Sequence, residues 1–235
     1  MRKTTVLGLI LVLALALLAA CGGDDDGASS SSSSSQPAAS SSQKAPSGGG
    51  MTLEQYANDR EDFRARIMAH KNKRRVAIGP NVTLYFEDAL TMQYQIQEML
   101  RLERIFEAEK IQEELDAYNP LIPDGSNLKA TMMVEFPDIE ERRAELQRLI
   151  GIETALWLAV GDLSRVTPIA NEDLDRETAD KTSAVHFVRF ELTEQMISAL
   201  RASEKLLIGI DHPAYGYAMQ VSTSTQAALV RDLKG

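Results

Sequence analysis

The chain has 235 residues, and its 25 Lys and Arg against 34 Asp and Glu give a formal net charge of −9 at pH 7. Because residues 1–50 carry equal numbers of basic and acidic groups, the whole negative excess belongs to residues 51–235, and we expect no nucleic-acid partner. The single cysteine excludes a disulfide within the chain and any zinc or iron–sulfur site built from several cysteines.

Residues 1–20 have the layout of a bacterial lipoprotein signal peptide. Arg2 and Lys3 precede an apolar run that ends in Leu18-Ala19-Ala20-Cys21. A membrane-spanning helix needs about 20 apolar residues, and this run is shorter, so an anchor is favoured over a span. The quartet resembles a lipobox, in which Cys21 is acylated, with palmitate among its chains, and becomes the N-terminus. The alternative is an ordinary signal peptide with a chance cysteine.

Residues 21–50 follow as the acylated cysteine and a low-complexity Ser/Gly linker. The segment has no aromatic or large aliphatic residue, so it cannot offset its ordering entropy and is expected to be flexible. Gly22 after the cysteine implies, by the same resemblance, the outer membrane with the domain facing the periplasm. Met51 follows three glycines and resembles a natural start of translation. The alternative location is therefore the cytoplasm, if the anchor is not native to this domain or is not processed.

From the sequence we predict that residues 51–235 form a single globular domain in which helices and strands alternate along the chain. In the first half we predict a helix (Leu53–Arg75), the two strands of a hairpin (Arg75–Ile78 and Val82–Phe86), two helices (Asp88–Glu109 and Lys110–Tyr118) and a third strand (Lys129–Phe136). In the second half we predict a helix (Asp138–Leu149), three strands (Ala155–Val160, Arg165–Ile169 and Ala184–Leu192) and a helix (Thr193–Ala202). Two strands (Lys205–Ile210 and Tyr217–Val221) and a closing helix (Thr223–Leu233) follow.

A weak internal repeat appears when the sequence is shifted by 54 residues. It aligns Ala130 with Ala184, Val134 with Val188, Phe136 with Phe190 and Leu146 with Leu200. Each copy is a strand followed by a helix. We therefore predict an α+β fold, with a mainly antiparallel sheet, helices packed on one face and two weakly similar strand–helix units.

Five segments carry a resemblance to domain-of-unknown-function family 3501, and the resemblance covers essentially all of residues 51–235. They are Lys73–Pro80, Tyr94–Arg101, Tyr118–Gly125, Ser183–Phe187 and Asp211–Tyr215. The resemblance implies a bacterial domain without an assigned activity, often encoded beside rubrerythrin-like and iron–sulfur proteins. It thereby implies a protein partner of that kind and a redox or oxidative-stress accessory role.

His186 is the first candidate site residue. The two-residue strand period puts it on one face with Val188 and Phe190, which fits a hydrogen-bonded histidine of the core. The alternative is a ligand or proton-transfer site formed with Arg189, Asp211 and His212, and a metal-dependent enzyme using His186 and His212. The chain has three histidines and no Glu-x-x-His or His-x-x-x-His pair.

Two polar stripes are candidates for binding anions, and a solvated helix face explains each of them equally well. The first contains Tyr94, Gln97, Glu98, Arg101 and Arg104, with Arg101 as the planar fork. The second is basic and could meet phosphates or an acidic partner through Arg60, Arg64, Lys71, Arg74 and Arg75.

No complete set of catalytic residues is present: the sequence has no Ser-His-Asp order, no nucleophile elbow and no phosphate-binding glycine loop. The leading hypothesis is therefore a membrane-anchored lipoprotein that carries a binding or accessory module. The redox accessory protein is the first alternative and the metal-dependent enzyme the second. No cofactor is specified by the sequence, and whether the domain is an enzyme stays open.

Overall fold

The computed structural model describes residues 51–172, 176, 178 and 180–234. The signal peptide, the lipidation of Cys21 and the linker predicted for residues 1–50 lie outside these described residues. The chain divides into two compact units, with the border between Phe63 and Arg64. In the first unit, helix α2 (Leu53–Asn72) begins, and the rings of Tyr56 and Phe63 meet edge to face with centroids 5.8 Å apart. The prediction of a single domain over residues 51–235 stays a prediction.

The predicted hairpin after α2 is confirmed with its bounds. Strands β1 (Arg75–Ile78) and β2 (Val82–Phe86) pair antiparallel, and Ile78 faces Val82 across the turn. Gly79 has a φ of 68° in this turn, a left-handed conformation that favours glycine. Helix α2 ends at Asn72, before the predicted Arg75, because Arg75 already belongs to β1.

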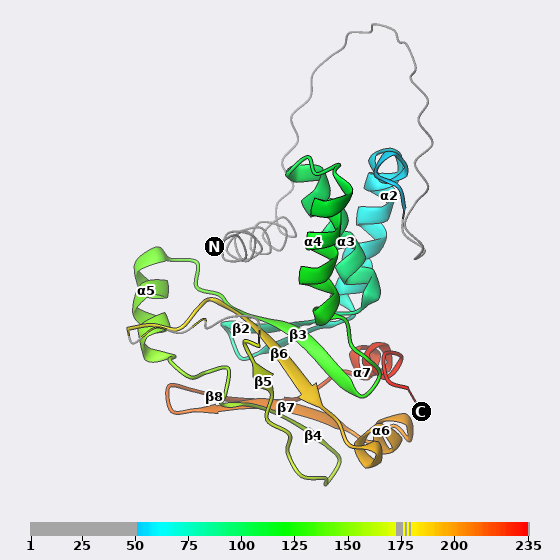
Figure 1. Cartoon of the computed structure of the whole chain (residues 1–235). Helices are drawn as coiled ribbons and strands as arrows, with labels where there is room; N and C mark the ends of the chain where they lie inside the picture. The colour runs from blue at the N-terminus through cyan, green and yellow to red at the C-terminus, as the bar shows by residue number, and fades with distance from the viewer. Residues whose placement is uncertain (1–50, 173–175, 177, 179, 235) are drawn as a thin grey trace, which may run out of the picture. The chain divides into compact units, whose positions relative to one another are not determined.

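The α+β prediction is confirmed, and the strands form two antiparallel sheets (Figure 1). The five-stranded sheet has the order β1-β2-β3-β6-β5, with β3 (Asn127–Val134), β5 (Ile169–Ala170) and β6 (Val185–Glu191). The three-stranded sheet has the order β4-β7-β8, with β4 (Leu156–Val160), β7 (Leu206–His212) and β8 (Tyr215–Gln220).

One apolar core joins the two sheets. Leu84 and Met132 from the five-stranded sheet and Leu158 and Ile208 from the three-stranded sheet have no exposed surface. Three helices close this core, namely α5 (Ile139–Arg148), α6 (Glu194–Arg201) and α7 (Thr223–Val230). Their N-caps follow the sequence rule: the side chains of Asp138, Thr193 and Ser222 each accept a backbone amide of the first turn.

Helices α3 (Ala89–Leu102) and α4 (Ala108–Tyr118) lie side by side, and a short 3₁₀ turn, Asn119–Leu121, follows α4 (Figure 1). The prediction that the first of these helices runs to Glu109 is wrong. Arg104 has a φ of 53°, and the Ile105 amide donates back to the Leu100 carbonyl at 2.9 Å. This left-handed residue and its closing hydrogen bond end the helix at Leu102.

Several strand boundaries also differ from the prediction: β3 spans Asn127–Val134 instead of Lys129–Phe136, and β8 spans Tyr215–Gln220 instead of Tyr217–Val221. Strand β7 continues through Asp211 and His212, because Asp211 pairs with Gly216 and His212 with Tyr215 in a tight hairpin. The strand predicted over Arg165–Ile169 is reduced to β5 and one bridge between Leu158 and Val166. Within the described part of the chain, no helix combines the length and the apolarity needed to cross a membrane.

Candidate functional site

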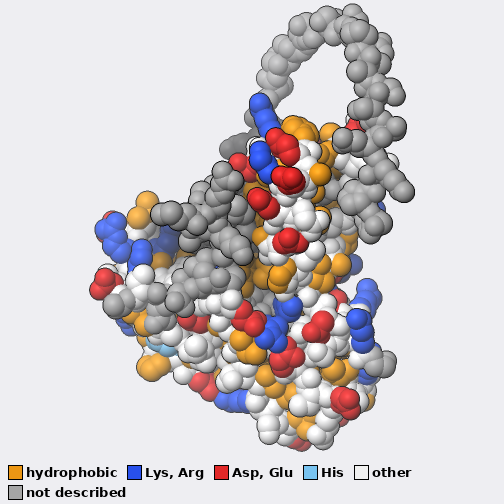
Figure 2. Space-filling model, in the orientation of Figure 1, with side chains coloured by type: hydrophobic (Ala, Val, Ile, Leu, Met, Phe, Trp, Pro, Cys, Tyr) orange, Lys and Arg blue, Asp and Glu red, His pale blue; other side chains and the backbone are white. Residues whose placement is uncertain are grey.

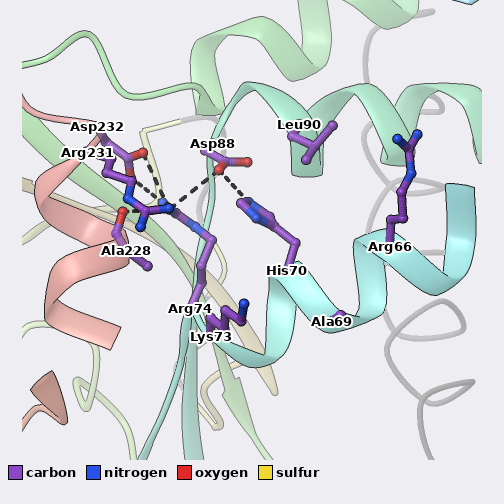
Figure 3. A pocket seen from close by; sticks show the side chains of 10 residues that line it. All are labelled: Arg66, Ala69, His70, Lys73, Arg74, Asp88, Leu90, Ala228, Arg231 and Asp232. Atoms are coloured by element: carbon purple, nitrogen blue, oxygen red, sulfur yellow. Dashed lines mark hydrogen bonds and ion pairs between the residues drawn. The ribbon is translucent and has the colours of Figure 1, made fainter. Parts of the chain in front are cut away.

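A hollow of about 400 Å³ is the candidate site (Figure 3). Its walls come from α2 and the turn after it, from the start of α3, and from the end of α7 with the two residues that follow. They are formed by Arg66, Ala69, His70, Lys73, Arg74, Asp88, Leu90, Ala228, Arg231 and Asp232. The volume lies in the range of pockets that hold small molecules, roughly 300–1,000 Å³.

Arg74 ties these three walls together. It is 2% exposed, and its guanidinium donates to the carbonyls of Phe86 at 2.9 Å, Glu87 at 3.1 Å and Ala228 at 3.2 Å. The same guanidinium pairs with both carboxylate oxygens of Asp232. Because every direction of the planar fork is used, Arg74 fixes the hollow's shape and is not available to a ligand.

The two carboxylate oxygens of Asp88, at the start of α3, make different contacts. One carboxylate oxygen caps the helix by accepting the Thr91 amide at 2.9 Å. The other lies 2.6 Å from Nε2 of His70 and 3.4 Å from Nη1 of Arg74. Burial acts to raise the pKa of Asp88, but Arg74, the Thr91 amide and His70 outweigh it and hold the pKa below the usual value.

The second carboxylate of the hollow, Asp232, follows α7. Burial raises the pKa of Asp232 above its usual value although the Arg74 guanidinium opposes the shift. Both carboxylates are thus engaged by Arg74, and Asp88 by His70 as well. Figure 3 shows these side chains converging, with His70 pointing from α2 toward Asp88.

Positive charge is in excess in the hollow. Three permanent cations of the lining, Lys73, Arg74 and Arg231, outnumber its two carboxylates, Asp88 and Asp232. Lys73 and Arg231 are exposed at its edge, and neither has an ion-pair partner among the described residues. On the face drawn in Figure 2, basic and acidic side chains are interspersed. The excess in the hollow is therefore local, within a chain whose net charge is −9.

The sequence analysis included Arg74 in the basic stripe but missed the rest of this site. A signal was present on α2, because Arg66, His70 and Arg74 recur at steps of four and so share one helix face. Asp88 was assigned to the helix start alone. Arg231 and Asp232 are more than 150 residues away in the chain, and only the packing of α7 brings them to Arg74.

His186 is a fully buried residue of β6 with polar neighbours. Its Nε2 lies 3.0 Å from the Ser183 carbonyl, which only accepts, so Nε2 donates there. Its Nδ1 lies 3.1 Å from the Asn171 amide nitrogen, and Glu153 is 3.8 Å from Nε2. This set of contacts describes a hydrogen-bonded histidine inside the domain.

The other three residues proposed for the His186 site have different neighbours. His212 lies in β7 of the other sheet, where Nε2 donates to the Ile150 carbonyl at 3.0 Å and Nδ1 accepts from the Ala214 amide at 3.2 Å. Asp211 pairs with Arg165 at 2.6 Å. Arg189 occupies the opposite face of β6 from His186, where Glu172 and Glu191 pair with it and raise its pKa against the effect of burial.

A metal site at these histidines gains no support from the geometry. Both ring nitrogens of His212 are used by backbone groups, and zinc needs a free ring nitrogen. Among the described residues, no group of three or more His, Cys, Asp and Glu side chains is arranged to hold a metal ion.

The residues of the first polar stripe, which lies on α3 and the turn after it, differ in burial. Tyr94, Gln97 and Glu98 are buried, whereas Arg101 and Arg104 are exposed, so the stripe as a whole is not a solvated helix face. The Arg101 fork pairs with both carboxylate oxygens of Glu98, at 3.3 and 3.1 Å. Because Glu98 balances its charge, Arg101 offers an anion less than the cations of the hollow do. Arg104 forms the left-handed end of α3.

Comparisons with known proteins identify a family and a solved structure whose functions are unknown. The family model described as "Protein of unknown function (DUF3501)" matches residues 50–233. A solved structure, described as a novel protein of unknown function from Burkholderia pseudomallei, is 51% identical, covers 79% of this chain and 96% of its own, and superposes with a TM-score of 0.75. No curated protein shows a significant match to the chain.

Proposed function

Since the chain belongs to the DUF3501 family of proteins of unknown function, its activity has to be argued from its own residues, and we propose that it is a binding module for small anions that an acylated Cys21 holds at a membrane. The observation that carries the proposal is the local excess of cations in the hollow. Two of them, Lys73 and Arg231, stand exposed at its edge, and both carboxylates are already engaged by Arg74.

Binding is favoured over covalent catalysis by the chemistry of the walls. The ten lining residues include no hydroxyl or thiol group, so they supply no nucleophile of the serine or cysteine kind. Arg74 and Asp88 instead keep the walls together through contacts between three elements. Such a preorganised set of charges lowers the cost of ordering side chains when a ligand arrives.

The anchor is the second part of the proposal and rests on the sequence. The segment Leu18-Ala19-Ala20-Cys21 supplies the acylation site, and Gly22 favours the outer membrane, with the domain in the periplasm. Two or more acyl chains are enough for stable attachment. The partnership with rubrerythrin-like or iron–sulfur proteins stays a prediction from the family resemblance.

Calorimetric titration of the full chain with inorganic phosphate and with citrate tests the binding role. We expect binding that weakens about tenfold in the Lys73→Gln/Arg231→Gln double variant, because two charge-assisted contacts are lost. Lys205→Gln, an exposed lysine away from the hollow, is the matched control and should bind like the original chain. No binding of either anion, or equal binding by the double variant, would overturn the proposed function.

The anchor is tested separately by expressing the full chain and its Cys21→Ser variant in a Gram-negative host. We expect the original chain in the outer-membrane fraction, with a mass that includes acyl chains, and the variant released from membranes. A free Cys21 thiol together with recovery in the cytosol would refute the anchor. It would not bear on the anion-binding role, which the calorimetric titration tests.

A further inference from the structure

We propose that two copies of this chain associate through the outer edge of β8, with the two β8 strands antiparallel and centred on Ala218. The pairing joins the three-stranded sheets of both copies into one continuous sheet. The inference goes beyond the proposed function, because β8 supplies none of the residues that line the hollow. It is carried by the open backbone of β8, by the absence of charge on this strand and by two exposed apolar side chains.

Strand β8 forms a sheet edge that differs from the other edges of the domain. In the order β4-β7-β8, it has β7 on one side and no described strand on the other (Figure 1). The opposite edge, β4, is closed by two hydrogen bonds between Leu158 and Val166. In the five-stranded sheet, β5 has two residues and β1 begins with the exposed Arg75. Proteins protect sheet edges by shortness, charge or a covering segment, and β8 has none of these among the described residues.

The backbone of β8 presents hydrogen-bonding groups on its outer side. The Val221 amide donates to the Leu206 carbonyl at 2.8 Å and marks one hydrogen-bonded pair of the β7–β8 ladder. Such pairs alternate with non-hydrogen-bonded pairs along an antiparallel ladder. The amides and carbonyls that point away from β7 therefore belong to Gly216, Ala218 and Gln220. All three residues are exposed, and none of them shares a backbone hydrogen bond with another described segment.

The composition of β8 suits a second copy of the same strand. Its sequence, Tyr-Gly-Tyr-Ala-Met-Gln, has no charged residue and no proline, and its pairing with β7 is continuous. In an antiparallel pair of identical strands, a charged residue at the centre would face its own like charge, which destabilises the pair. A strand that recognises a charged partner would instead carry complementary charges. The absence of charge therefore favours self-association.

The register of the pair follows from the outward backbone groups. A two-fold axis at Ala218 places this residue opposite its copy and Gly216 opposite Gln220 of the second copy. All three outward residues of each strand then form hydrogen-bonded pairs. A centre at Tyr217 or at Met219 leaves one outward residue of each strand without a partner. Centring on Ala218 therefore gives the largest number of hydrogen bonds.

The same register covers exposed apolar surface. Tyr217 is 45% exposed and Met219 is 38% exposed, and the two-residue strand period puts them on one face of β8. The Tyr217 ring is held against the ring of Tyr215, with centroids 4.7 Å apart. In the pair centred on Ala218, Tyr217 faces Met219 of the second copy, and a thioether sulfur next to an aromatic ring is a favourable contact. The two-fold axis forms this contact twice.

The first test is sedimentation velocity of the full chain with Cys21→Ser, so that acylation does not hold copies together. One strand edge is smaller than a standard interface of about 1,600 Å², so we expect a dimer that dissociates at roughly micromolar concentrations. Ala218→Lys should weaken the association at least about tenfold, because two like charges then face each other. Ala144→Lys, which adds the same charge at an exposed position of α5, is the matched control and should associate like the Cys21→Ser chain.

The second test is disulfide cross-linking in the same Cys21→Ser chain, which then has no other cysteine. In Ala218→Cys, the two facing Cα atoms lie about 5.5 Å apart, within the range of a disulfide, so mild oxidation should give a covalent dimer. Gly216→Cys is the matched control, because a Cβ there meets nothing within 4 Å. The two copies of this residue are about 13 Å apart in the proposed register, too far for a disulfide.

The outcomes that overturn the inference are distinct from those that concern anion binding. A Cys21→Ser chain that stays monomeric as its concentration rises would refute the pairing. Association that Ala218→Lys leaves unchanged would place the dimer contact on another surface. Equal cross-linking of Ala218→Cys and Gly216→Cys would contradict the register. None of these results bears on the hollow, whose anion binding is measured by calorimetry.

Discussion

Met132 and His186 face each other as partners in the β3–β6 pair, and they are also equivalent residues of the 54-residue repeat. The repeat equates Ala130 with Ala184, whereas the sheet pairs Ala130 with Val188. The two strands of the repeat therefore lie side by side and run in opposite directions about the Met132–His186 pair. Such a pair marks a local two-fold relation between the two strands.

The same separation of 54 residues occurs once in the second sheet. Leu156 of β4 pairs with Ile210 of β7, and these residues are again 54 apart in the chain. In each sheet, one strand pair thus brings together two residues that are 54 apart in the chain. The copies differ where the first has Met132 and the second has a buried histidine, which needs hydrogen-bond partners that a methionine does not.

Replacing His186 by Gln should destabilise the domain. The Ser183 carbonyl and the Asn171 amide would lose partners inside the protein, which costs about 2 kcal/mol of unfolding free energy. Urea denaturation at pH 7 measures the loss. His212→Gln is the control, because His212 is only half-buried, and it should cost about 1 kcal/mol or less. Equal losses would contradict the structural role given to His186.

Removing the hydroxyl of Tyr215 should weaken the connection between the sheets. This hydroxyl donates to the Ile78 carbonyl at 2.7 Å and accepts the amides of Asn81 at 2.9 Å and Val82 at 3.1 Å. Burial raises the pKa of Tyr215 although the two amides oppose the shift. Tyr215→Phe leaves three backbone groups without this partner and should cost about 1–3 kcal/mol in urea denaturation.

Tyr217→Phe is the matched control for that change. Tyr217 lies two residues further along β8 and is 45% exposed, so loss of its hydroxyl should change the unfolding free energy by less than about 0.5 kcal/mol. A Tyr215→Phe variant as stable as this control would mean that the hydroxyl does not join the sheets.

Gly209 and Gly216 provide a paired test of packing in the three-stranded sheet. A Cβ at Gly209 would come within 2.4 Å of the Trp157 ring and 2.8 Å of the Tyr217 carbonyl oxygen. A Cβ at Gly216 would meet nothing within 4 Å. Thermal unfolding should show Gly209→Ala destabilised by about 1–3 kcal/mol and Gly216→Ala nearly unchanged. Comparable effects of the two substitutions would argue against the close approach of Trp157.

Asp88→Asn should reveal the pH-dependent contribution of the Asp88 carboxylate. Asparagine still caps a helix, so the variant removes mainly the charge that faces Arg74 and His70, and we expect a loss of about 2 kcal/mol at pH 7. Because the pKa of Asp88 in the folded state is below the ordinary value of 3.8, this stabilisation is present above that value and is lost as the pH falls through the folded-state pKa.

The measurement is the difference in unfolding free energy between the original chain and Asp88→Asn at pH 7 and at pH 3. The difference should shrink at the lower pH. Asp162→Asn, which removes an exposed carboxylate, serves as the control and should show little difference at either pH. A difference that grows toward acid would mean that the pKa of Asp88 is shifted in the other direction.

Local sequence signals were enough for most elements of this domain. The bounds of β1 and β2 and the caps Asp138 and Thr193 were predictable because alternation and capping depend on residues that are neighbours in the chain. Helix α3 was predicted too long because Arg104 has no intrinsic preference for the left-handed conformation that ends it.

The sequence by itself determined the net charge, the order of the elements, the repeat, and the layout of residues 1–21 that predicts an anchor. Only the tertiary structure decided that the strands form two sheets, that His186 and His212 have separate surroundings, and that Arg74 joins Asp88 to Asp232. The reason is physical: a helix or strand is specified by contacts a few residues apart, whereas a site depends on which distant segments the core packs together. Arg74 and Asp232 lie 158 residues apart, and no periodicity in the chain encodes their contact.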